Sequence, residues 1–294
     1  MGYSLGEERT TSYAVPAGDL DGDGDLDLVV GNDRAQNLIY TNDGTGRFTL
    51  AGRLSDDADL TRDVQLADLN GDGWLDAVVA NRRAENVIYL GDGRGGFGQR
   101  KAFGTSDDST IKLALGDLDS DGDLDLVLAN RDGQANRVYL NDGHAGFDEV
   151  RPFGTGRDES LASAVADLNG DGRLDIVTAN ADEPNAVYFG DGNGGFDESV
   201  LFGRSDGQSF SVAIADLDRD GDQDIVIGNF GMQNAVFFNE GLGRRFTELR
   251  FGSAQGITYW LTTGDVDGDG FIDIGVVNSD GLNGIYLNRP SEDE

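Results

Sequence analysis

The stretch Asp19-Leu20-Asp21-Gly22-Asp23-Gly24-Asp25-Leu26-Asp27 is the first of six copies of one pattern, D-x-D-x-D-G-x-x-D, in which Asn replaces the second Asp in two copies. The other copies begin at Asp68, Asp117, Asp167, Asp216 and Asp265, so the pattern returns every 49 or 50 residues. A constant period of this length indicates a repeat architecture in which each repeat is one structural unit. We therefore expect a single domain over residues 1–294, with loops at 19–27, 68–76, 117–125, 167–175, 216–224 and 265–273.

Each copy of the pattern places hard oxygen atoms around one point. Positions 1, 3, 5 and 9 supply side-chain oxygens, Gly at position 6 permits the turn that folds them inward, and position 7 offers its backbone carbonyl. Ca²⁺ accepts roughly six to eight oxygen ligands from flexible loops. Zn²⁺ and copper prefer nitrogen and sulfur, and the chain has one His and no Cys. Asp and Gly also favour ordinary turns, but turns alone do not require Gly at position 6 in all six copies.

The sequence therefore predicts up to six Ca²⁺ sites. The predicted ligand residues are Asp19, Asp21, Asp23, Asp25, Asp27, Asp68, Asn70, Asp72, Trp74, Asp76, Asp117, Asp119, Asp121, Asp123, Asp125, Asp167, Asn169, Asp171, Arg173, Asp175, Asp216, Asp218, Asp220, Asp222, Asp224, Asp265, Asp267, Asp269, Phe271 and Asp273.

The EF-hand loop shares positions 1, 3, 5 and 6 with this pattern, but it needs a bidentate Glu at position 12 and flanking helices. Position 12 is occupied here by Val30, Val79, Leu128, Thr178, Ile227 and Val276. None of these residues is a carboxylate, and most belong to apolar runs of β type. The loop is therefore expected to join two strands, with Asp at position 9 closing the cage.

The second repeat shows the strands expected in every repeat. Residues 62–67, 75–80, 87–90 and 97–103 are rich in β-branched, aromatic and other apolar residues and are separated by clusters of Asn, Asp and Gly, which are strand and turn signals. Four strands in a period of 40–50 residues are typical of a propeller blade. We predict an all-β, six-bladed β-propeller with four antiparallel strands per blade. The sixth repeat ends after its third strand, and we expect residues 2–6 to complete the last blade.

Two recurrent polar positions have a predicted structural role. In the second repeat, Asn81 and Asn86 flank the turn between the second and third strands, and Thr61 stands seven residues before the first Asp of the loop. Equivalent Asn pairs and an equivalent Ser or Thr occur in all six repeats. Because they recur in every repeat, we expect the Asn residues to make turn hydrogen bonds and the hydroxyl to cap the start of the first strand.

The composition restricts the partners and the location of the protein. The net charge of −33 repels phosphate backbones and anionic lipid, so nucleic acid and membrane surfaces are excluded. No apolar stretch is long enough to span a membrane, so no membrane insertion is expected. Ca²⁺ loops of extracellular modules bind at roughly 10⁻⁴–10⁻³ M, which predicts an extracellular protein, secreted or on the cell surface. This chain shows no signal peptide at its start. We expect a monomer.

Several motifs together resemble FG-GAP/VCBS repeats, the Ca²⁺-binding propeller repeats of integrin α-subunit heads and of many secreted bacterial proteins. The motifs are the D-x-D-x-D-G-x-x-D loop, the following L-D-L-V-V-x-N strand, N-x-(I/V)-Y, N-D-G-x-G-x-F and the closing F-G. The resemblance covers essentially the whole chain and implies Ca²⁺ between strands one and two, with ligands on the opposite face. The chain departs from integrins in having six repeats rather than seven and an intact loop in all six, so integrin-like cell adhesion does not follow from it.

Side chains that break the repeat pattern are candidates for a second site. At the end of the repeats opposite the loops, aromatic residues stand near Arg or Lys and could hold a sugar ring or a peptide; packing between blades is the alternative. The candidate ligand-binding residues are Arg62, Lys112, Phe230, Met232, Tyr259 and Trp260.

No catalytic site is expected. His144 is the only His, and the chain has no Cys and no Ser-based constellation, which excludes nucleophilic triads. The sequence predicts a non-catalytic, Ca²⁺-binding propeller that acts as an extracellular scaffold for a protein or glycan ligand. Two alternatives stay open, a lectin-like carbohydrate-binding module and a polysaccharide lyase or other carbohydrate-active propeller.

Overall fold

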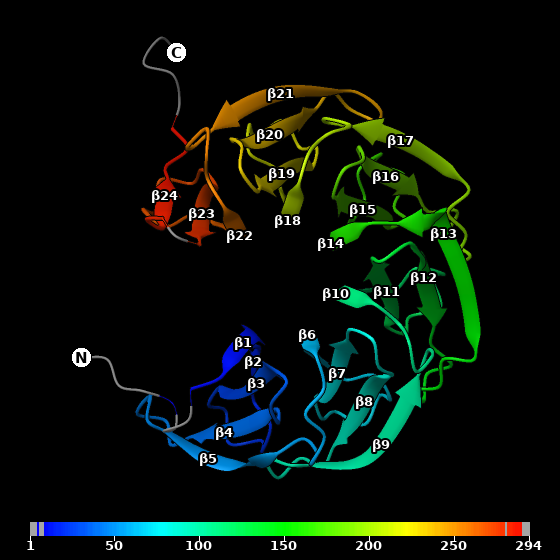
Figure 1. Ribbon diagram of the computed structural model, residues 1–294, viewed down its shortest axis with the longest axis vertical. Helices are drawn as coiled ribbons and strands as arrows, with labels where there is room; N and C mark the ends of the chain where they lie inside the picture. Colours follow the sequence, from blue (N-terminus) through cyan, green and yellow to red (C-terminus); the bar gives the residue numbers. More distant parts are fainter. Residues whose placement is uncertain (1–4, 6–8, 280, 290–294) are drawn as a thin grey trace. The chain divides into compact units, whose positions relative to one another are not determined.

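The computed structural model describes residues 5, 9–279 and 281–289. Within these residues all regular secondary structure is β, with 24 strands arranged in six sheets. Neighbouring strands of each sheet are antiparallel and follow one another in chain order (Figure 1). No helix among the described residues has the length and apolar character needed to cross a membrane.

The first three sheets comprise thirteen strands. They are β1 (Thr11–Ala14), β2 (Ala17–Gly18), β3 (Asp27–Asp33), β4 (Leu38–Asn42), β5 (Phe48–Arg53), β6 (Thr61–Ala67), β7 (Asp76–Asn81), β8 (Asn86–Gly91), β9 (Phe97–Phe103), β10 (Thr110–Gly116), β11 (Asp125–Asn130), β12 (Gln134–Leu140) and β13 (Glu149–Asp158). β1 and β2 both pair with β3 and together occupy the place of one first strand.

The last three sheets comprise eleven strands. They are β14 (Ser160–Ala166), β15 (Asp175–Asn180), β16 (Asn185–Phe189), β17 (Glu198–Phe202), β18 (Ser209–Ala215), β19 (Asp224–Asn229), β20 (Asn234–Asn239), β21 (Phe246–Phe251), β22 (Thr258–Gly264), β23 (Asp273–Asn278) and β24 (Gly284–Tyr286).

The predicted fold class is confirmed: the chain is an all-β protein of six β-propeller blades. In the second repeat, each end of the four strands lies within one residue of its predicted position. The sixth sheet shows three strands within the described residues. The predicted strand from residues 2–6 falls on a stretch of which only Leu5 is described, so that part of the prediction lies outside the described residues. The chain divides into two compact units, residues 1–113 with 141–149, and residues 114–140 with 150–294.

In four of the six sheets the second strand is buried over its whole length. Every residue of β7, β11, β15 and β19 is buried. These strands are nearly continuous apolar runs because both faces of the sheet are covered there. The fourth strands β9 and β21 are mostly exposed, which agrees with their polar sequences.

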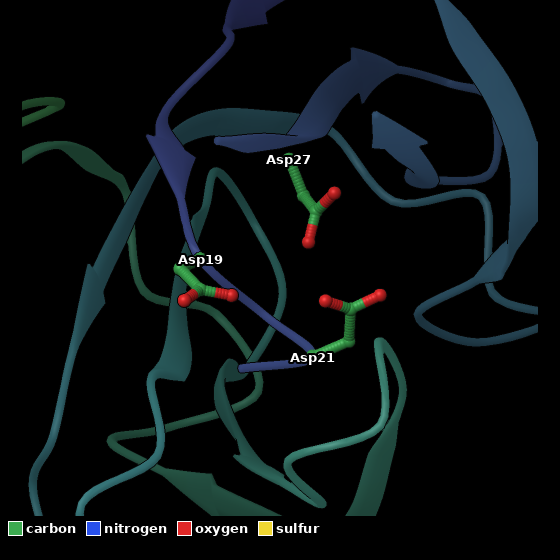
Figure 2. Close-up of side chains that lie close together, drawn as sticks. All are labelled: Asp19, Asp21 and Asp27. Carbon is green, nitrogen blue, oxygen red and sulfur yellow. The ribbon is translucent and has the colours of Figure 1, made fainter. Parts of the chain in front are cut away.

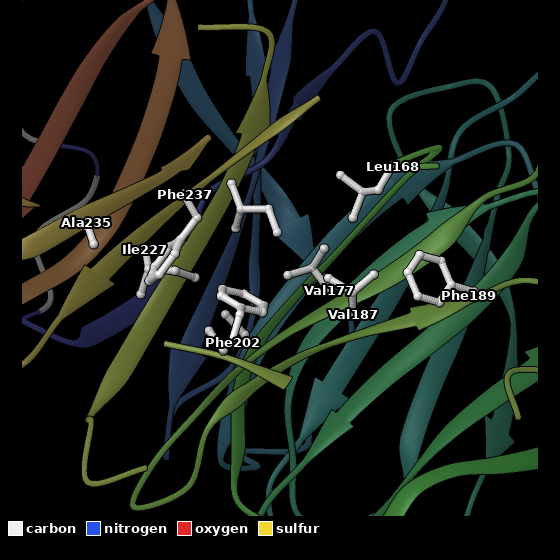
Figure 3. Packing of buried hydrophobic residues seen from close by; sticks show 11 residues of the cluster. Leu168, Val177, Val187, Phe189, Phe202, Ile227, Ala235 and Phe237 are labelled. Atoms are coloured by element: carbon white, nitrogen blue, oxygen red, sulfur yellow. The ribbon is translucent and has the colours of Figure 1, made fainter. Parts of the chain in front are cut away.

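In the second compact unit, the core between the fourth and fifth sheets is built from aromatic and β-branched side chains (Figure 3). The ring of Phe202 lies 4.9 Å from that of Phe237, edge to face, and 5.5 Å from that of Phe246. Phe202 belongs to the recurrent F-G motif, and Gly203 follows it with a φ of 74°, a conformation that Gly adopts without strain. The motif therefore inserts an aromatic anchor between two blades and then turns the chain toward the next one.

A hydroxyl relay joins successive sheets at the turn between their second and third strands. Asn81 N donates to Asn86 Oδ1 (2.8 Å), and Thr61 Oγ1 donates to Asn81 Oδ1 (3.0 Å). Thr61 also accepts a hydrogen bond from Asn37 Nδ2 of the preceding repeat (3.1 Å). Equivalent bonds join Asn86 to Thr110 and Asn136 to Ser160. The predicted turn role of the Asn pairs is thus confirmed, and the hydroxyl has a further role in linking two blades.

Replacing Thr61 by Val tests this relay. The side chain is 1% exposed, so Val keeps its shape but leaves Asn81 Oδ1 and Asn37 Nδ2 without this partner. A buried polar atom that loses its partner costs about 1–3 kcal/mol, and we expect the free energy of unfolding in urea to fall by about 2–3 kcal/mol. The control is Thr49→Val, at an exposed position of β5. Equal effects of the two substitutions would contradict the relay.

Candidate metal centre

The first Asp-rich loop connects β2 to β3 and brings three carboxylates together. Asp19, Asp21 and Asp27, at positions 1, 3 and 9, each offer an oxygen, and these oxygens lie within 4.8 Å of one another. Figure 2 shows the three carboxylates converging on a common space. The spacing is that of a group which could hold a metal ion.

Three further loops form such groups, with one difference between them. The third and fifth loops use the same positions, in Asp117, Asp119 and Asp125 and in Asp216, Asp218 and Asp224. The sixth loop instead gathers positions 1, 3 and 5, in Asp265, Asp267 and Asp269.

The second and fourth loops carry Asn at position 3 and so lack a third carboxylate at that place. Asn70 Nδ2 donates to Asp72 Oδ2 (3.1 Å), and Asn169 Nδ2 donates to Asp171 Oδ2 (3.3 Å). Asn still offers its side-chain carbonyl oxygen as a ligand. Its NH₂ group donates a hydrogen bond to the carboxylate at position 5 and so partly stabilises the negative charge there.

Backbone N–H groups hold the carboxylates in place. In the first loop, Asp19 accepts hydrogen bonds from Gly22 N at Oδ1 (2.7 Å) and from Gly24 N at Oδ2 (3.0 Å). Asp23 Oδ1 accepts from Asp25 N (2.9 Å). The loop therefore orients Asp19 and Asp23 before any ion is present, because each carboxylate accepts hydrogen bonds from the turn that carries it.

Position 9 has a structural role as well as a place in the cage. Asp27 is fully buried, and its two oxygens accept from Leu20 N (3.0 Å) and from Asn42 N (2.8 Å). The same pair of bonds, from position 2 and from the residue fifteen places after the Asp, is made by Asp76, Asp175, Asp224 and Asp273. Position 9 thus ties the loop to the hairpin of its own blade.

Each of the first five loops is held by the next repeat through the carbonyl of position 2, a role that was not predicted from the sequence. Leu20 is 3% exposed, and its carbonyl accepts a hydrogen bond from Gly95 N of the following hairpin (3.0 Å). Gly194 N reaches Leu118 O in the same way (3.1 Å). The amides of Asn239 and Asn288 reach the carbonyls of Leu168 and Leu217. A signal for this contact was present, because position 2 is Leu in five loops and Val in the sixth.

Two positions of the loop, 4 and 6, adopt a left-handed backbone. Position 6 is always Gly, as the sequence analysis required, and position 4 is Gly in four loops but Ser120 and Arg219 in the other two, with φ of 66° and 65°. Left-handed α geometry costs an L-residue roughly 1–2 kcal/mol. The loop imposes this geometry to let position 1 accept its N–H bonds, as the bond from Arg219 N to Asp216 Oδ1 (2.7 Å) shows.

Burial and repulsion between carboxylates disfavour ionisation of the loop side chains when no cation is bound. Burial raises the pKa of Asp21, Asp119 and Asp218, the position-3 residues of three loops, and neighbouring carboxylates raise it further. Burial raises the pKa of Asp175 and Asp224, at position 9, to about 6, although two backbone N–H groups partly offset the shift. A cation placed among these groups would reverse the effect, because it favours the ionised form.

The donor set fits a hard divalent cation. Every side chain in the four groups is a carboxylate, and oxygen ligands select Ca²⁺ or Mg²⁺ over softer metals. Asp119 Oδ1 is buried and accepts no hydrogen bond from the described residues. A buried, unpaired carboxylate oxygen is costly, and a cation in the third loop would satisfy it.

Position 7 turns its side chain away from the cage. The ring of Trp74, 39% exposed, lies beside Gly22 of the first loop and Gly93 of the following hairpin, where an added Cβ would stand 3.0 Å and 2.3 Å from it. The Arg173 side chain lies against Gly192 in the same manner. These contacts leave only the backbone of position 7 for the predicted ligand role.

The candidate ligand-binding residues separate into two groups. Arg62 pairs with Asp33 (3.2 Å) and stacks over the ring of Tyr13, and Lys112 pairs with the buried Asp63 (2.8 Å), so both cations have partners within the protein. Phe230 and Tyr259 instead gather around Phe210, while Trp260 is 46% exposed on β22 and Met232 is half-buried after β19.

Replacing Ser120 by Gly tests the backbone strain at position 4. Gly relieves the left-handed penalty of about 1–2 kcal/mol and adds an entropic cost of about 0.5–1 kcal/mol. We expect a net gain of about 0.5–1 kcal/mol in the free energy of unfolding. The matched control is Ser199→Gly, at an exposed position of β17 with an ordinary backbone, which should destabilise. A loss of stability in both variants would count against strain in the loop.

The raised pKa values predict how the stability of the cation-free protein depends on pH. Asp175 and Asp224 have a folded pKa of about 6 against an ordinary value of 3.8, so folding favours their protonated forms. The stability they contribute is fully present below pH 3.8 and is lost as pH rises through about 6. In a chelator, the melting temperature should fall over this window.

The variant Asp175→Asn/Asp224→Asn should show a smaller fall between these pH values than the wild type. The control variant Asp57→Asn/Asp148→Asn removes two exposed carboxylates and should keep the wild-type slope. If the loop variant and the control have the same slope, the two loop residues do not carry the shifted pKa.

Comparison with known proteins agrees with this architecture. The FG-GAP-like repeat matches residues 19–79, 68–128, 117–178, 167–227 and 216–276. None of the curated proteins has a sequence that matches the chain.

Solved structures share the fold at low sequence identity. An Agrocybe aegerita lectin that recognises non-reducing terminal N-acetylglucosamine superimposes with a TM-score of 0.63 and 22% identity, over 91% of this chain and 75% of the lectin chain. BBS1N, in a complex with ARL6DN, superimposes with a TM-score of 0.63 and 14% identity, over 94% of this chain and 77% of its own. Identities this low show a common fold and no more. The repeat matches and the blade structure together place this chain in the FG-GAP repeat family.

Proposed function

We propose that this protein is a calcium-binding, non-catalytic β-propeller that acts outside the cell as a scaffold for a protein or glycan ligand. The observation that carries the proposal is the convergence of carboxylate oxygens within 4.8 Å in four loops, one of them with a buried oxygen that accepts no hydrogen bond from the part of the chain that the structure describes. Like charges this close need a counter-ion to remain ionised.

Ca²⁺ suits these loops better than Mg²⁺. Ca²⁺ accepts flexible geometries with many oxygen ligands, whereas Mg²⁺ demands a near-ideal octahedron and retains several waters. The loop offers carboxylates from positions 1, 3, 5 and 9, a position-7 carbonyl, and Asn oxygens in two loops. Bound Ca²⁺ would supply positive charge and cross-link the loop. Because position 2 of the loop is clamped by the next hairpin, this cross-link would also stabilise the contact between successive blades.

A non-catalytic role is supported by the surroundings of the basic side chains. Both Lys residues are engaged: Lys101 Nζ donates to the carbonyls of His144 and Ala145 (2.8 and 3.1 Å), and Lys112 pairs with Asp63. His144, the only His, lies exposed in a hairpin. A lyase needs a base positioned over its substrate, and these contacts favour a structural use of each candidate.

A glycan ligand is the second candidate for the scaffold. The lectin with a similar fold binds a sugar, and the exposed rings of Phe230 and Tyr259 are surfaces on which a sugar could stack. BBS1N, with the same fold, is found in complex with a protein. The two neighbours thus support a binding scaffold in general, and binding of the chain to a glycan array would favour the lectin-like role.

Calcium should raise the melting temperature strongly above that in EGTA. One site at 100 times its Kd contributes about 2.7 kcal/mol, and each kcal/mol shifts the melting temperature of a protein this size by roughly 2–4 °C. A single filled site therefore predicts a rise of about 5–10 °C, and several sites predict more. The variant Asp19→Asn/Asp21→Asn should lose part of this rise, and the exposed Asp57→Asn should not. Equal melting temperatures in calcium and in EGTA would rule out calcium-dependent stability.

Trp74 offers a direct readout of ion binding. Trp74 belongs to the second loop and its ring lies beside Gly22 of the first loop, so excitation of Trp should sensitise the luminescence of Tb³⁺ bound in place of Ca²⁺. Trp74→Phe should abolish most of the signal, Trp260→Phe should preserve it, and excess Ca²⁺ should compete it away. A signal that depends on Trp260 instead would contradict binding in these loops.

A further inference from the structure

A patch of three aromatic rings lies in the second compact unit, away from the Asp-rich loops. Phe210 is the second residue of β18, Phe230 follows β19, and Tyr259 is the second residue of β22 (Figure 1). The rings of Phe210 and Phe230 are stacked with centroids 5.5 Å apart, and Tyr259 meets Phe210 edge to face at 5.4 Å. We call these three residues the aromatic patch.

The patch lies at the opposite end of the strands from the fifth metal loop. β19 begins at Asp224, position 9 of that loop, and ends at Asn229, next to Phe230. A six-residue strand spans roughly 20 Å at about 3.3 Å per residue. A ligand on the patch would therefore be independent of the ion-binding groups.

The backbone holds the patch in a fixed arrangement. Phe230 N donates to Gln208 O (2.8 Å), Gly231 N donates to Gly256 O (2.6 Å), and Phe230 forms a β-bridge with Ile257. Three segments that are separate in the sequence are thus joined beneath the rings. Such preorganisation lowers the entropic cost of binding.

The fold does not require the ring of Phe230. The position of Phe230 is occupied in the other repeats by Asp33, Arg82, Arg131, Ala181 and Ser279. Phe230 and Tyr259 remain 41% and 44% exposed, in a chain with a net charge of −33. Exposed aromatic clusters of this kind mark interaction sites.

The shape and composition of the patch favour a protein segment over a small molecule. Small-molecule sites are cavities of roughly 300–1,000 Å³, whereas the hollow lined by Asn229 and Met232, which lie close to Phe230 in the sequence, is about 20 Å³ and is lined by none of the three rings. Aromatic residues and Met are enriched in the cores of protein interfaces, and Met adapts to varied partners.

The charge around the patch favours a basic partner. Gln208, whose carbonyl holds Phe230 N, donates its side-chain amide to the carboxylate of Asp182 (2.5 Å). The acidic side chain of Asp182 is therefore linked to the patch through Gln208. The net charge of −33 would also attract a cationic partner over long range.

We propose that the aromatic patch is a docking surface for a basic protein segment that carries an apolar or aromatic anchor residue. The anchor packs on Phe230 and Tyr259, and flanking Lys or Arg residues of the partner approach Asp182. This assignment rests on the proposed role as a binding scaffold and gives that role a location and a partner chemistry.

The test uses a library of short random peptides displayed on phage and selected against the full chain in calcium. Peptides that bind are then measured on two variants. Phe230→Ser introduces the residue of the sixth repeat at this position, and Leu249→Ser removes an apolar side chain that is 55% exposed on β21, in the same sheet. Both variants should keep the calcium response of the wild type, so a failure of the calcium proposal is recognised separately.

We expect the selected peptides to combine Trp, Phe or Leu with neighbouring Lys or Arg, and to bind more weakly as salt is added. Phe230→Ser should weaken binding at least about tenfold, as for an interface hot spot, and Leu249→Ser should leave it unchanged. Peptides that bind Phe230→Ser as well as the wild type, or that carry no basic residues, would overturn the proposal. So would glycan binding that is lost in Phe230→Ser, because the patch would then be a sugar platform.

Discussion

The structure depends on one electrostatic constraint. In four of the six repeats, oxygens of three carboxylates lie within 4.8 Å of one another and repel each other when ionised. Backbone N–H groups at positions 4 and 6 orient the Asp at position 1, and the Asp at position 9 is buried with both oxygens bonded to the chain. Neither arrangement removes the repulsion among the carboxylates, which adds to the burial that raises the pKa of Asp175 and Asp224. A divalent cation is the simplest counter-charge that such a cage can accept.

The same loop is also a joint between blades. Its second residue is a buried Leu in five repeats, whose carbonyl accepts a bond from the next hairpin. At the other end of the strands, a Ser or Thr hydroxyl connects the Asn pair of one repeat to that of the next. Apolar side chains such as Phe202 fill the space between these two polar joints. Successive repeats within a compact unit therefore contact each other through the same kinds of feature, which explains why these features recur with so constant a period.

The sequence was sufficient for the fold and for the position of the loops. The period of 49 or 50 residues and the strand signals located every strand of the second repeat to within one residue. The left-handed backbone at position 4 was not predicted. Gly occupies this position in four loops and indicates a positive φ, but Ser120 and Arg219 in the other two loops do not. The relay through Thr61 was also missed, since it joins residues of different repeats. Contacts between repeats depend on packing, which the pattern within one repeat does not specify.

The aromatic patch lies at the strand ends where the side chains differ from one repeat to another. Position by position, the repeats agree at the loops and differ at the opposite strand ends, where Arg62 is paired with Asp33 in one place and Phe230 is stacked on Phe210 in another. Ion binding in the loops can be tested with an anomalous difference map from crystals grown in calcium chloride. We expect peaks inside the Asp-rich loops, among the oxygens of positions 1, 3 and 9 in the first, third and fifth loops. A map in which these loops hold only water would contradict it.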